Sequence, residues 1–303
     1  MIAKQEDRNS PETVRIDAMN TSFFIVAYDC KIKNWKQIIV DWIFYVEEEW
    51  SRFKQGNELS KVNQLEDGKE APVSPPLFDL LIRAEEYRKK TNGFFSPYLL
   101  PQMEFHGYNR SFPFQTSEEM DVKIPPVYSI EKCPFSLNMH TQKVKRLTEG
   151  QLDLGGIAKG YVVQAAANWL KEQGRSPAGM VDGGGDISVW SKNDKEWRIS
   201  IAHPIQTELD IGMFRIKNGA IATSNILYRS WYQGQQEKHH LLNGKTGEPV
   251  KTNIIQATAI TESCVDAEVM AKLCFMAGGQ ELDKLLNTIH PNYSYILVTK
   301  EEK

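Results

Sequence analysis

The stretch LDLGGIAKGYVVQAAANWL, residues 152–170, decides how the fold of this 303-residue chain is interpreted. It begins as a buried strand, turns on two adjacent glycines and continues as an amphipathic helix with Lys159 in its first turn. An anion can bind at such a turn, because free backbone N–H groups point outward there and the helix dipole is positive. Glycine permits close backbone approach, and a lysine adds a point charge suited to phosphate.

Taken alone, the same stretch is more typical of a tight strand-to-helix turn with an exposed lysine. It matches neither a P-loop nor the full G-x-G-x-x-G fingerprint of dinucleotide-binding proteins. The loop in VDGGGDISVW, residues 181–190, contains three glycines and is therefore sterically open to a ligand. Glycines in this position more often mark a hairpin or a bulge. Neither segment predicts a function without support from the rest of the chain.

Composition narrows the class of protein. The chain is 41% hydrophobic and 25% charged, which is ordinary for a globular protein. A net charge of −3 argues against a broad basic surface, so we expect no nucleic-acid partner. The four cysteines are scattered, which is typical of reduced, buried thiols. The N-terminus is polar and no stretch is long enough to cross a membrane, so the sequence predicts a cytoplasmic protein without a membrane span.

Hydrophobic periodicity predicts an α+β or mixed α/β fold. Between residues 177 and 260, short runs separated by turn residues indicate a largely antiparallel sheet. Residues 54–64, KQGNELSKVNQ, are expected to form a loop. We expect residues 1–17 to be disordered or extended and residues 18–303 to form a single domain, since no linker divides them. The other predicted elements are strands at 22–30 and 293–300 and helices at 34–53, 75–93, after the Gly-Gly turn, at about 262–276 and at 279–289.

Three further segments carry candidate functional side chains. In TNGFFSP, residues 91–97, Phe94 and Phe95 could stack on a planar ring, although phenylalanine is more often a core residue; Phe53 presents the same choice. His239 and His240 lie on a predicted strand and point to opposite faces, so only one can reach a cleft, where it could act as a general base.

Asp266 falls in the first turn of a predicted helix. A carboxylate there is favourable with the helix dipole. It is also the kind of ligand that Mg²⁺ prefers.

The order of these segments resembles the ApbE family, the FAD:protein FMN transferases. The likeness runs from AMNTSF at residue 18 to the end of the chain, and LDLGGIAKGY followed by GGGDI and ATS is specific in combination. The resemblance implies an ApbE-like, T-fold-related architecture with mixed, largely antiparallel sheets flanked by helices. The remaining matching segments are NELSKVNQ, TNGFFSP, HLLNGKTGEP and the helix that carries Asp266.

The resemblance also implies an activity. The family moves FMN from FAD to a threonine or serine hydroxyl of a target flavoprotein, with Mg²⁺ as cofactor and AMP as the released product. By this likeness, Asp153 and Lys159 would hold the ribose and diphosphate, and His240 would lie beside the reacting phosphate. The carbonyl of Gly156 and the carboxylate of Asp266 would bind the metal, so that His240 and Asp266 are the expected catalytic residues. The residues expected to border the flavin nucleotide are Met19, Phe53, Gly93, Phe94 and Phe95.

Several positions depart from the family pattern. Met270 stands where the family has a threonine one turn after the metal aspartate, and a thioether is a poor ligand for Mg²⁺. Two alternatives therefore accompany the transferase prediction. One is an FAD-binding homologue with weak or no transferase activity, and the other is a metal-dependent FAD pyrophosphatase in which water is the nucleophile. The other departures are Asn20, Ser96, Tyr98, Gln164, Asn225, Asn243 and Gly244.

Overall fold

The computed structural model describes residues 10–119, 123–192 and 194–300. At its centre lies a seven-stranded sheet in which neighbouring strands run antiparallel, so the predicted α+β class with largely antiparallel sheets is confirmed. Across the sheet the strands are β1 (Glu12–Ala18), β2 (Thr21–Ala27), β7 (Ala178–Gly183), β8 (Asp186–Ser191), β11 (Gly219–Asn225), β14 (Ile254–Thr261) and β15 (Ser294–Thr299).

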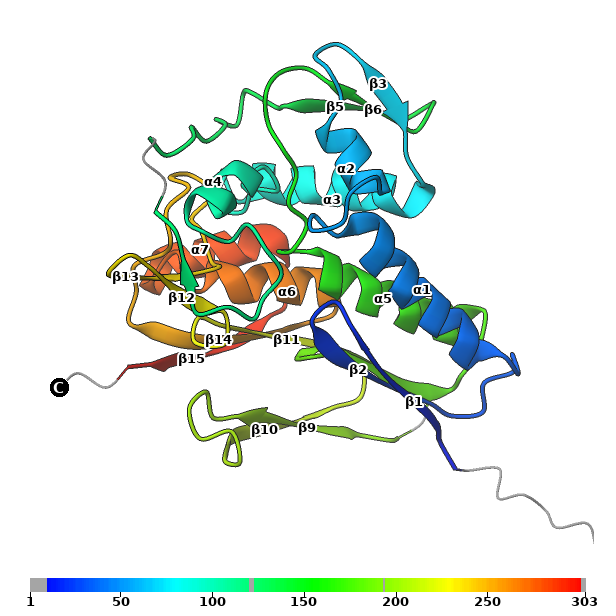
Figure 1. The fold of residues 1–303 in the computed structure, drawn as a ribbon. Helices are drawn as coiled ribbons and strands as arrows, with labels where there is room; N and C mark the ends of the chain where they lie inside the picture. Colours follow the sequence, from blue (N-terminus) through cyan, green and yellow to red (C-terminus); the bar gives the residue numbers. More distant parts are fainter. Residues whose placement is uncertain (1–9, 120–122, 193, 301–303) are drawn as a thin grey trace, which may run out of the picture.

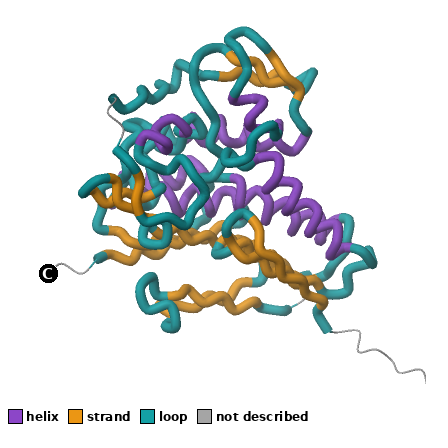
Figure 2. Tube along the Cα trace, viewed as in Figure 1, coloured by secondary structure: helices purple, strands orange, loops and turns teal. Residues whose placement is uncertain are grey.

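The helices gather on one side of this sheet (Figure 1). Helix α5 packs against β7 and β8, helix α6 packs against β11 and β14, and the two helices also contact each other. Figure 2 shows the resulting layers, with the helices above the strands. The helices are α1 (Trp35–Trp50), α2 (Glu58–Asn63), α3 (Pro75–Lys90), α4 (Leu100–Phe105), α5 (Ala158–Glu172), α6 (Cys264–Leu273) and α7 (Gly279–Ile289).

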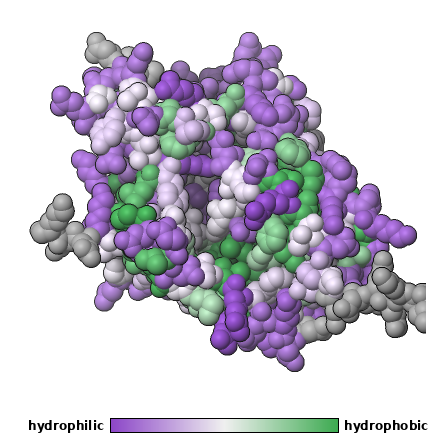
Figure 3. All heavy atoms as spheres, turned by 60° about the horizontal axis from the view of Figure 1, so that its bottom comes forward, coloured by the Kyte–Doolittle hydropathy of each residue, from purple (hydrophilic) through white to green (hydrophobic). Residues whose placement is uncertain are grey.

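The opposite face of the sheet is covered by a hairpin of β9 (Trp197–Ala202) and β10 (Asp210–Ile216). Val189, Ile199 and Ile221 form a second, smaller hydrophobic core between the hairpin and the sheet. Figure 3 is turned so that this side comes forward, and it shows apolar residues in separate patches around a hollow on a mostly hydrophilic face. The main hydrophobic core lies on the helical side of the sheet and contains buried residues of α1, α3, α5 and α6. The candidate site lies on the same side.

Two small three-stranded sheets complete the structure. One consists of β3 (Glu70–Pro72), β6 (Lys143–Arg146) and β5 (Phe135–Asn138). The other consists of β13 (Gln236–His239), β12 (Ser230–Gln233) and β4 (Thr116–Ser117), in which β12 and β4 run parallel. Strand β13 matters for function because it ends immediately before His240.

The prediction of a loop at residues 54–64 is wrong, because helix α2 lies there. Asn57 caps α2 by accepting a hydrogen bond from the Ser60 N–H at 2.8 Å, and it donates to the carbonyl of Ser51 at 2.7 Å. At the other end of α2, the Asn63 amide exchanges hydrogen bonds of 3.0 and 2.7 Å with the backbone of Leu152. Two asparagines thus tie the end of α1 to the segment that leads into the Gly-Gly turn.

Among the described residues, no helix has the length and apolar character needed to cross a membrane. Strand β1 occupies part of the segment predicted to be disordered or extended, and residues 1–9 lie outside the described residues. The division into this segment and a single domain at residues 18–303 stays a prediction.

Candidate functional site

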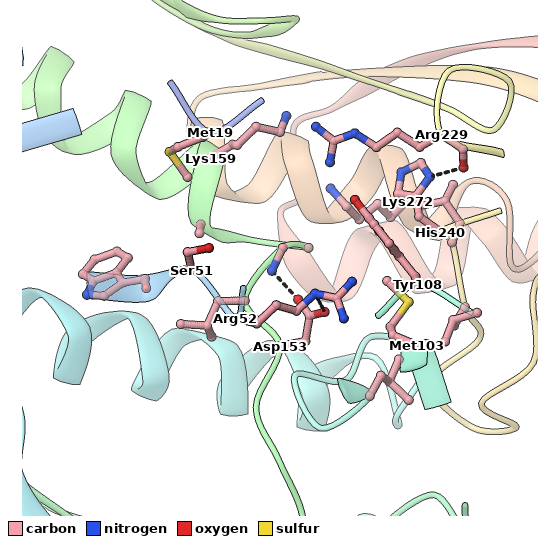
Figure 4. Close-up of a pocket in the computed structure, with 18 of the residues that line it drawn as sticks. Met19, Ser51, Arg52, Met103, Tyr108, Asp153, Lys159, Arg229, His240 and Lys272 are labelled. Atoms are coloured by element: carbon pink, nitrogen blue, oxygen red, sulfur yellow. Dashed lines mark hydrogen bonds and ion pairs between the residues drawn. The ribbon is translucent and has the colours of Figure 1, made fainter. Parts of the chain in front are cut away.

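A cavity of about 400 Å³ opens on the helical side of the sheet. That volume lies in the range of small-molecule binding sites. Its walls come from the β1–β2 turn, the end of α1, the TNGFFSP segment, the Gly-Gly turn, the loop after β11, the residues after β13 and the end of α6. Segments that are distant in sequence therefore converge on one pocket (Figure 4).

Most of the residues predicted from the sequence line this pocket. Gly93 and Asp266 are not among its lining residues. Gly93 has a φ of +82° and donates to the carbonyl of Arg88 at 2.8 Å, so it closes the C-terminus of α3. Asp266 accepts a hydrogen bond from the Tyr87 hydroxyl of α3. The predicted residues that line the pocket are Met19, Phe53, Phe94, Phe95, Asp153, Gly156, Lys159 and His240.

One wall of the pocket is built around Arg52, just after α1. Its guanidinium carbon lies 4.4 Å from the ring centroids of both Phe53 and Tyr108, and its Nε forms an ion pair with Asp153 Oδ2 at 3.2 Å. The Arg52 side chain is 7% exposed, yet its two terminal nitrogens have no hydrogen-bond partner among the described residues. A buried guanidinium with unused donors is poised to bind a polar ligand group.

The Gly-Gly turn is shaped by Asp153. The second carboxylate oxygen, Oδ1, accepts a hydrogen bond from the Gly155 N–H at 2.6 Å, and the Asp153 N–H donates to the carbonyl of Pro97 at 2.8 Å. Asp153 therefore fixes the turn and Arg52 together. A side chain at Gly156 would place its Cβ 3.4 Å from the ring of Phe95 and 3.8 Å from Lys272 Cε, so the pocket narrows there.

Two buried ion pairs join α5, α6 and the sheet beneath this turn. Lys159 Nζ contacts Asp186 of β8, and Lys272 Nζ lies 3.0 Å from Glu268 Oε1 on α6. Glu268 Oε2 also accepts a hydrogen bond of 2.7 Å from the Gly160 N–H, which would otherwise lack a partner at the start of α5. Burial lowers the pKa of Lys159, but the carboxylates of Asp186 and Glu268 outweigh it, so the pKa is raised and the ammonium form is stabilised.

His240 reaches the pocket at the edge of this charged group. Burial, followed by repulsion from Arg229, lowers the pKa of His240 well below its usual range, so the imidazole is neutral at pH 7. The ring Nδ1 lies 3.3 Å from the carbonyl oxygen of Arg229, which can only accept a hydrogen bond. Nδ1 therefore carries the proton, and Nε2 is left free to act as a base. His239 instead bonds the carbonyl of Val250 at 3.0 Å, so the two imidazoles diverge as strand alternation predicts.

Three cations converge near the Gly-Gly turn. Figure 4 shows Lys159, Arg229 and Lys272 entering from three different segments, with His240 beside Lys272. Arg229 has no ion-pair partner within the part of the chain that the structure describes. Its positive charge contributes to the lowered pKa of His240 and partly offsets the rise in the pKa of Lys159.

Sequence reasoning missed Arg52, Tyr108, Arg229, Glu268 and Lys272. A signal for two of them was present. Glu268 and Lys272 are spaced i, i+4 on a mostly buried helix, and buried charges need a partner or a ligand. No comparable signal marks Arg52 or Tyr108, because their arrangement depends on contacts between distant segments.

The fold and the pocket together define an α+β protein whose pocket combines converging cations with aromatic side chains. The chain belongs to the ApbE family, whose model matches residues 19–297. It is 26% identical over 238 residues to the FAD:protein FMN transferase of Vibrio cholerae serotype O1, covering 75% of this chain and 68% of that protein. It is 24% identical over 252 residues to the FAD:protein FMN transferase of Chlamydia muridarum, covering 77% and 72% of the two chains.

Solved structures show the same fold. The ApbE protein of Thermotoga maritima superposes with a TM-score of 0.80 at 21% identity, covering 96% of this chain and 94% of that one. The flavinyl transferase ApbE of Pseudomonas stutzeri, in its apo form, superposes with a TM-score of 0.79 at 16% identity, covering 97% and 92%. The match to the family model confirms the family named from sequence motifs, and the superpositions confirm the fold.

Proposed function

We propose that this protein is a flavinyl transferase that moves FMN from FAD to a threonine or serine hydroxyl of a target flavoprotein. One observation carries the proposal. In a chain of the ApbE family, three cations and a neutral histidine meet at one end of a pocket whose other wall carries the aromatic rings of Phe53 and Tyr108. Such an arrangement suits a ligand with a planar ring and a diphosphate.

The residues supply the chemistry of the transfer as follows. The acceptor hydroxyl oxygen attacks the phosphorus on the FMN side of FAD, the bond from that phosphorus to the bridging oxygen breaks, and AMP leaves with that oxygen. His240 Nε2 takes the hydroxyl proton. Lys159, Arg229 and Lys272 stabilise the charge that spreads over the phosphoryl oxygens, and positioning and charge stabilisation are the main sources of catalysis in such transfers.

The residues predicted to hold Mg²⁺ do not fit that ion. Asp266 Oδ1 is engaged by the Tyr87 hydroxyl, and the Asp266 carboxylate does not line the pocket. Met270, which replaces the expected threonine, is fully buried and offers only a soft sulfur. The expectation that Asp266 is catalytic stays a prediction.

A second candidate function is FAD binding without transfer, and the buried Met270 favours it because it removes a ligand that the family uses. The pyrophosphatase alternative needs the same base, since His240 Nε2 would then take a proton from water. The three activities differ in their products, so one assay separates them.

The assay incubates the purified protein with FAD and a panel of flavoprotein acceptor domains, then denatures the mixture. We expect acceptor-bound flavin fluorescence and an equal amount of AMP, both abolished in His240→Gln. Release of FMN and AMP without acceptor-bound flavin would identify the pyrophosphatase. Recovery of intact FAD with every acceptor would identify the binding protein and refute the transferase.

A further inference from the structure

A lysine side chain of the protein lies beside the glycine whose carbonyl the family resemblance assigns to a divalent cation. The carbon stem of Lys272 runs beside Gly156, whose carbonyl was expected to bind the metal; Lys272 Cε lies 3.8 Å from the position of a Cβ at Gly156. Lys272 comes from the last turn of α6 and lines the pocket.

The remaining donors expected for a metal are turned away or unsuitable. Mg²⁺ requires oxygen ligands in near-octahedral geometry. Asp266 is hydrogen-bonded to Tyr87, and Met270 is buried in the core of α6. Across the three described ranges, no group of three or more histidine, cysteine, aspartate or glutamate side chains is placed to hold a metal ion.

Glu268 fixes the Lys272 ammonium in position. Lys272 Nζ lies 3.0 Å from Glu268 Oε1 and 3.4 Å from the Glu268 carbonyl oxygen, while Glu268 Oε2 is anchored to the Gly160 N–H of α5. An ammonium group has three N–H donors. Two are directed to Glu268, which leaves the third for a ligand in the pocket.

The surrounding charges favour an anion. Lys159 is balanced by Asp186 and Lys272 by Glu268, while Arg229 lacks an ion-pair partner among the described residues. These three cations and two carboxylates sum to a charge of +1. The N-terminus of α5 adds the positive end of its dipole at the Gly-Gly turn.

We propose that Lys272, held by Glu268 and assisted by Lys159 and Arg229, takes the place of a divalent cation at the diphosphate. The protein then binds FAD without Mg²⁺. This inference rests on the proposed function and specifies the source of positive charge at the same site.

The test compares the binding of FAD and of riboflavin, which lacks phosphate, by flavin fluorescence in Mg²⁺ and in EDTA. We expect FAD to bind equally well in both buffers. Lys272→Met removes the charge but keeps the stem, and it should weaken FAD binding about 10- to 100-fold while leaving riboflavin binding unchanged. Lys272→Arg retains the charge and should recover most of the affinity for FAD.

Two controls address folding and metal binding directly. The double variant Lys272→Met/Glu268→Gln removes the buried ion pair as a neutral unit, and the amide oxygen can still accept from Gly160 N–H; it should lose FAD affinity as Lys272→Met does. Mn²⁺ titration followed by electron paramagnetic resonance should show no protein-bound Mn²⁺ in the wild type, with or without FAD.

Mg²⁺-dependent FAD binding, site-bound Mn²⁺, or unchanged FAD affinity in Lys272→Met would overturn this inference and leave the proposed function in place. Failure of FAD to bind in either buffer would remove the proposed function and this inference with it.

Discussion

The charged side chains on the two walls of the pocket are paired to different extents. On the wall formed by α5 and α6, Lys159 and Lys272 each contact a carboxylate that is at most 2% exposed. On the wall that follows α1, Arg52 lies between two aromatic rings with both terminal nitrogens unbonded to any described residue. The lysines of the first wall are held by carboxylates before a ligand arrives. Arg52 also pairs with Asp153 through Nε, but both of its terminal nitrogens remain for the ligand (Figure 4).

This difference predicts that substitutions on one wall mainly lower stability, whereas substitutions on the other mainly weaken ligand binding. Removing one partner of a buried pair leaves an uncompensated charge and destabilises the folded state. Changing a group with unused donors alters ligand binding more than folding. We therefore expect variants that remove a carboxylate partner on the α5–α6 wall to lower stability most. Variants at Arg52 should change FAD binding more than stability.

The largest expected effect is the loss of stability in Asp186→Ala. Lys159 would lose its carboxylate partner in a buried site, and we expect the free energy of unfolding to fall by about 3–5 kcal/mol. Asp194→Ala is the matched control, because the Asp194 side chain is fully exposed beside Lys217 and its removal should leave stability nearly unchanged. Urea denaturation of both variants measures the difference, and equal losses would contradict the distinction between the walls.

A smaller loss is expected when α5 is pushed away from α6. A Cβ at Gly160 would lie 2.7 Å from the carbonyl oxygen of Cys264, a backbone atom that cannot move aside on its own. Gly160→Ala should therefore cost about 1–3 kcal/mol of stability and loosen the Glu268 contact that holds Lys272. Gly278→Ala is the control, since nothing lies within 4 Å of its Cβ position. Equal melting temperatures for the two variants in thermal unfolding would show that α5 and α6 are not tightly packed at Gly160.

The third effect concerns pH. The pKa of His240 is lowered by burial and by Arg229, so the unfolded chain binds the proton more readily than the folded one. The stabilising contribution of neutral His240 is complete above the unfolded pKa of about 6.5 and is lost as the pH falls below it. Between pH 7 and pH 5 this contribution should decrease by at most about 2 kcal/mol. Urea denaturation at both pH values should show a larger fall in the wild type than in His240→Gln, and parallel curves would refute the neutral assignment.

The sequence predicts the first part of the site well because the information there is local. Asp153, Gly155 and Lys159 lie within one short segment, and the glycines specify the turn before α5. The strand predicted at the start of this segment is wrong, because residues 151–154 form no paired strand. The same locality explains why most helices were predicted from their apolar periodicity. Helix α2 was missed because its apolar stripe is short, and distant hydrogen bonds from Asn57 and Asn63 hold it in place.

The rest of the site depends on which helices become neighbours. A family resemblance carries residue types from one chain to another, but it does not reveal that the stem of Lys272 lies beside Gly156. Nor does it reveal that Tyr87 of α3 donates to Asp266 of α6. Both contacts arise from helix packing, and both bear on the expected metal site, which is why that expectation fits the structure least well.

The smallest expected effect is a loss of FAD affinity when Arg52 is changed. Arg52→Lys keeps a positive charge near Asp153 but loses the planar guanidinium between Phe53 and Tyr108 and its unused donors. We expect FAD affinity to fall about two- to tenfold, which is the range of a cation–π contact and a charge-assisted hydrogen bond, with little change in stability. Lys54→Arg is the control at the same rim, because Lys54 pairs with an exposed glutamate. If Arg52→Lys instead lowers stability and leaves FAD binding intact, Arg52 belongs with the fixed charges of the opposite wall.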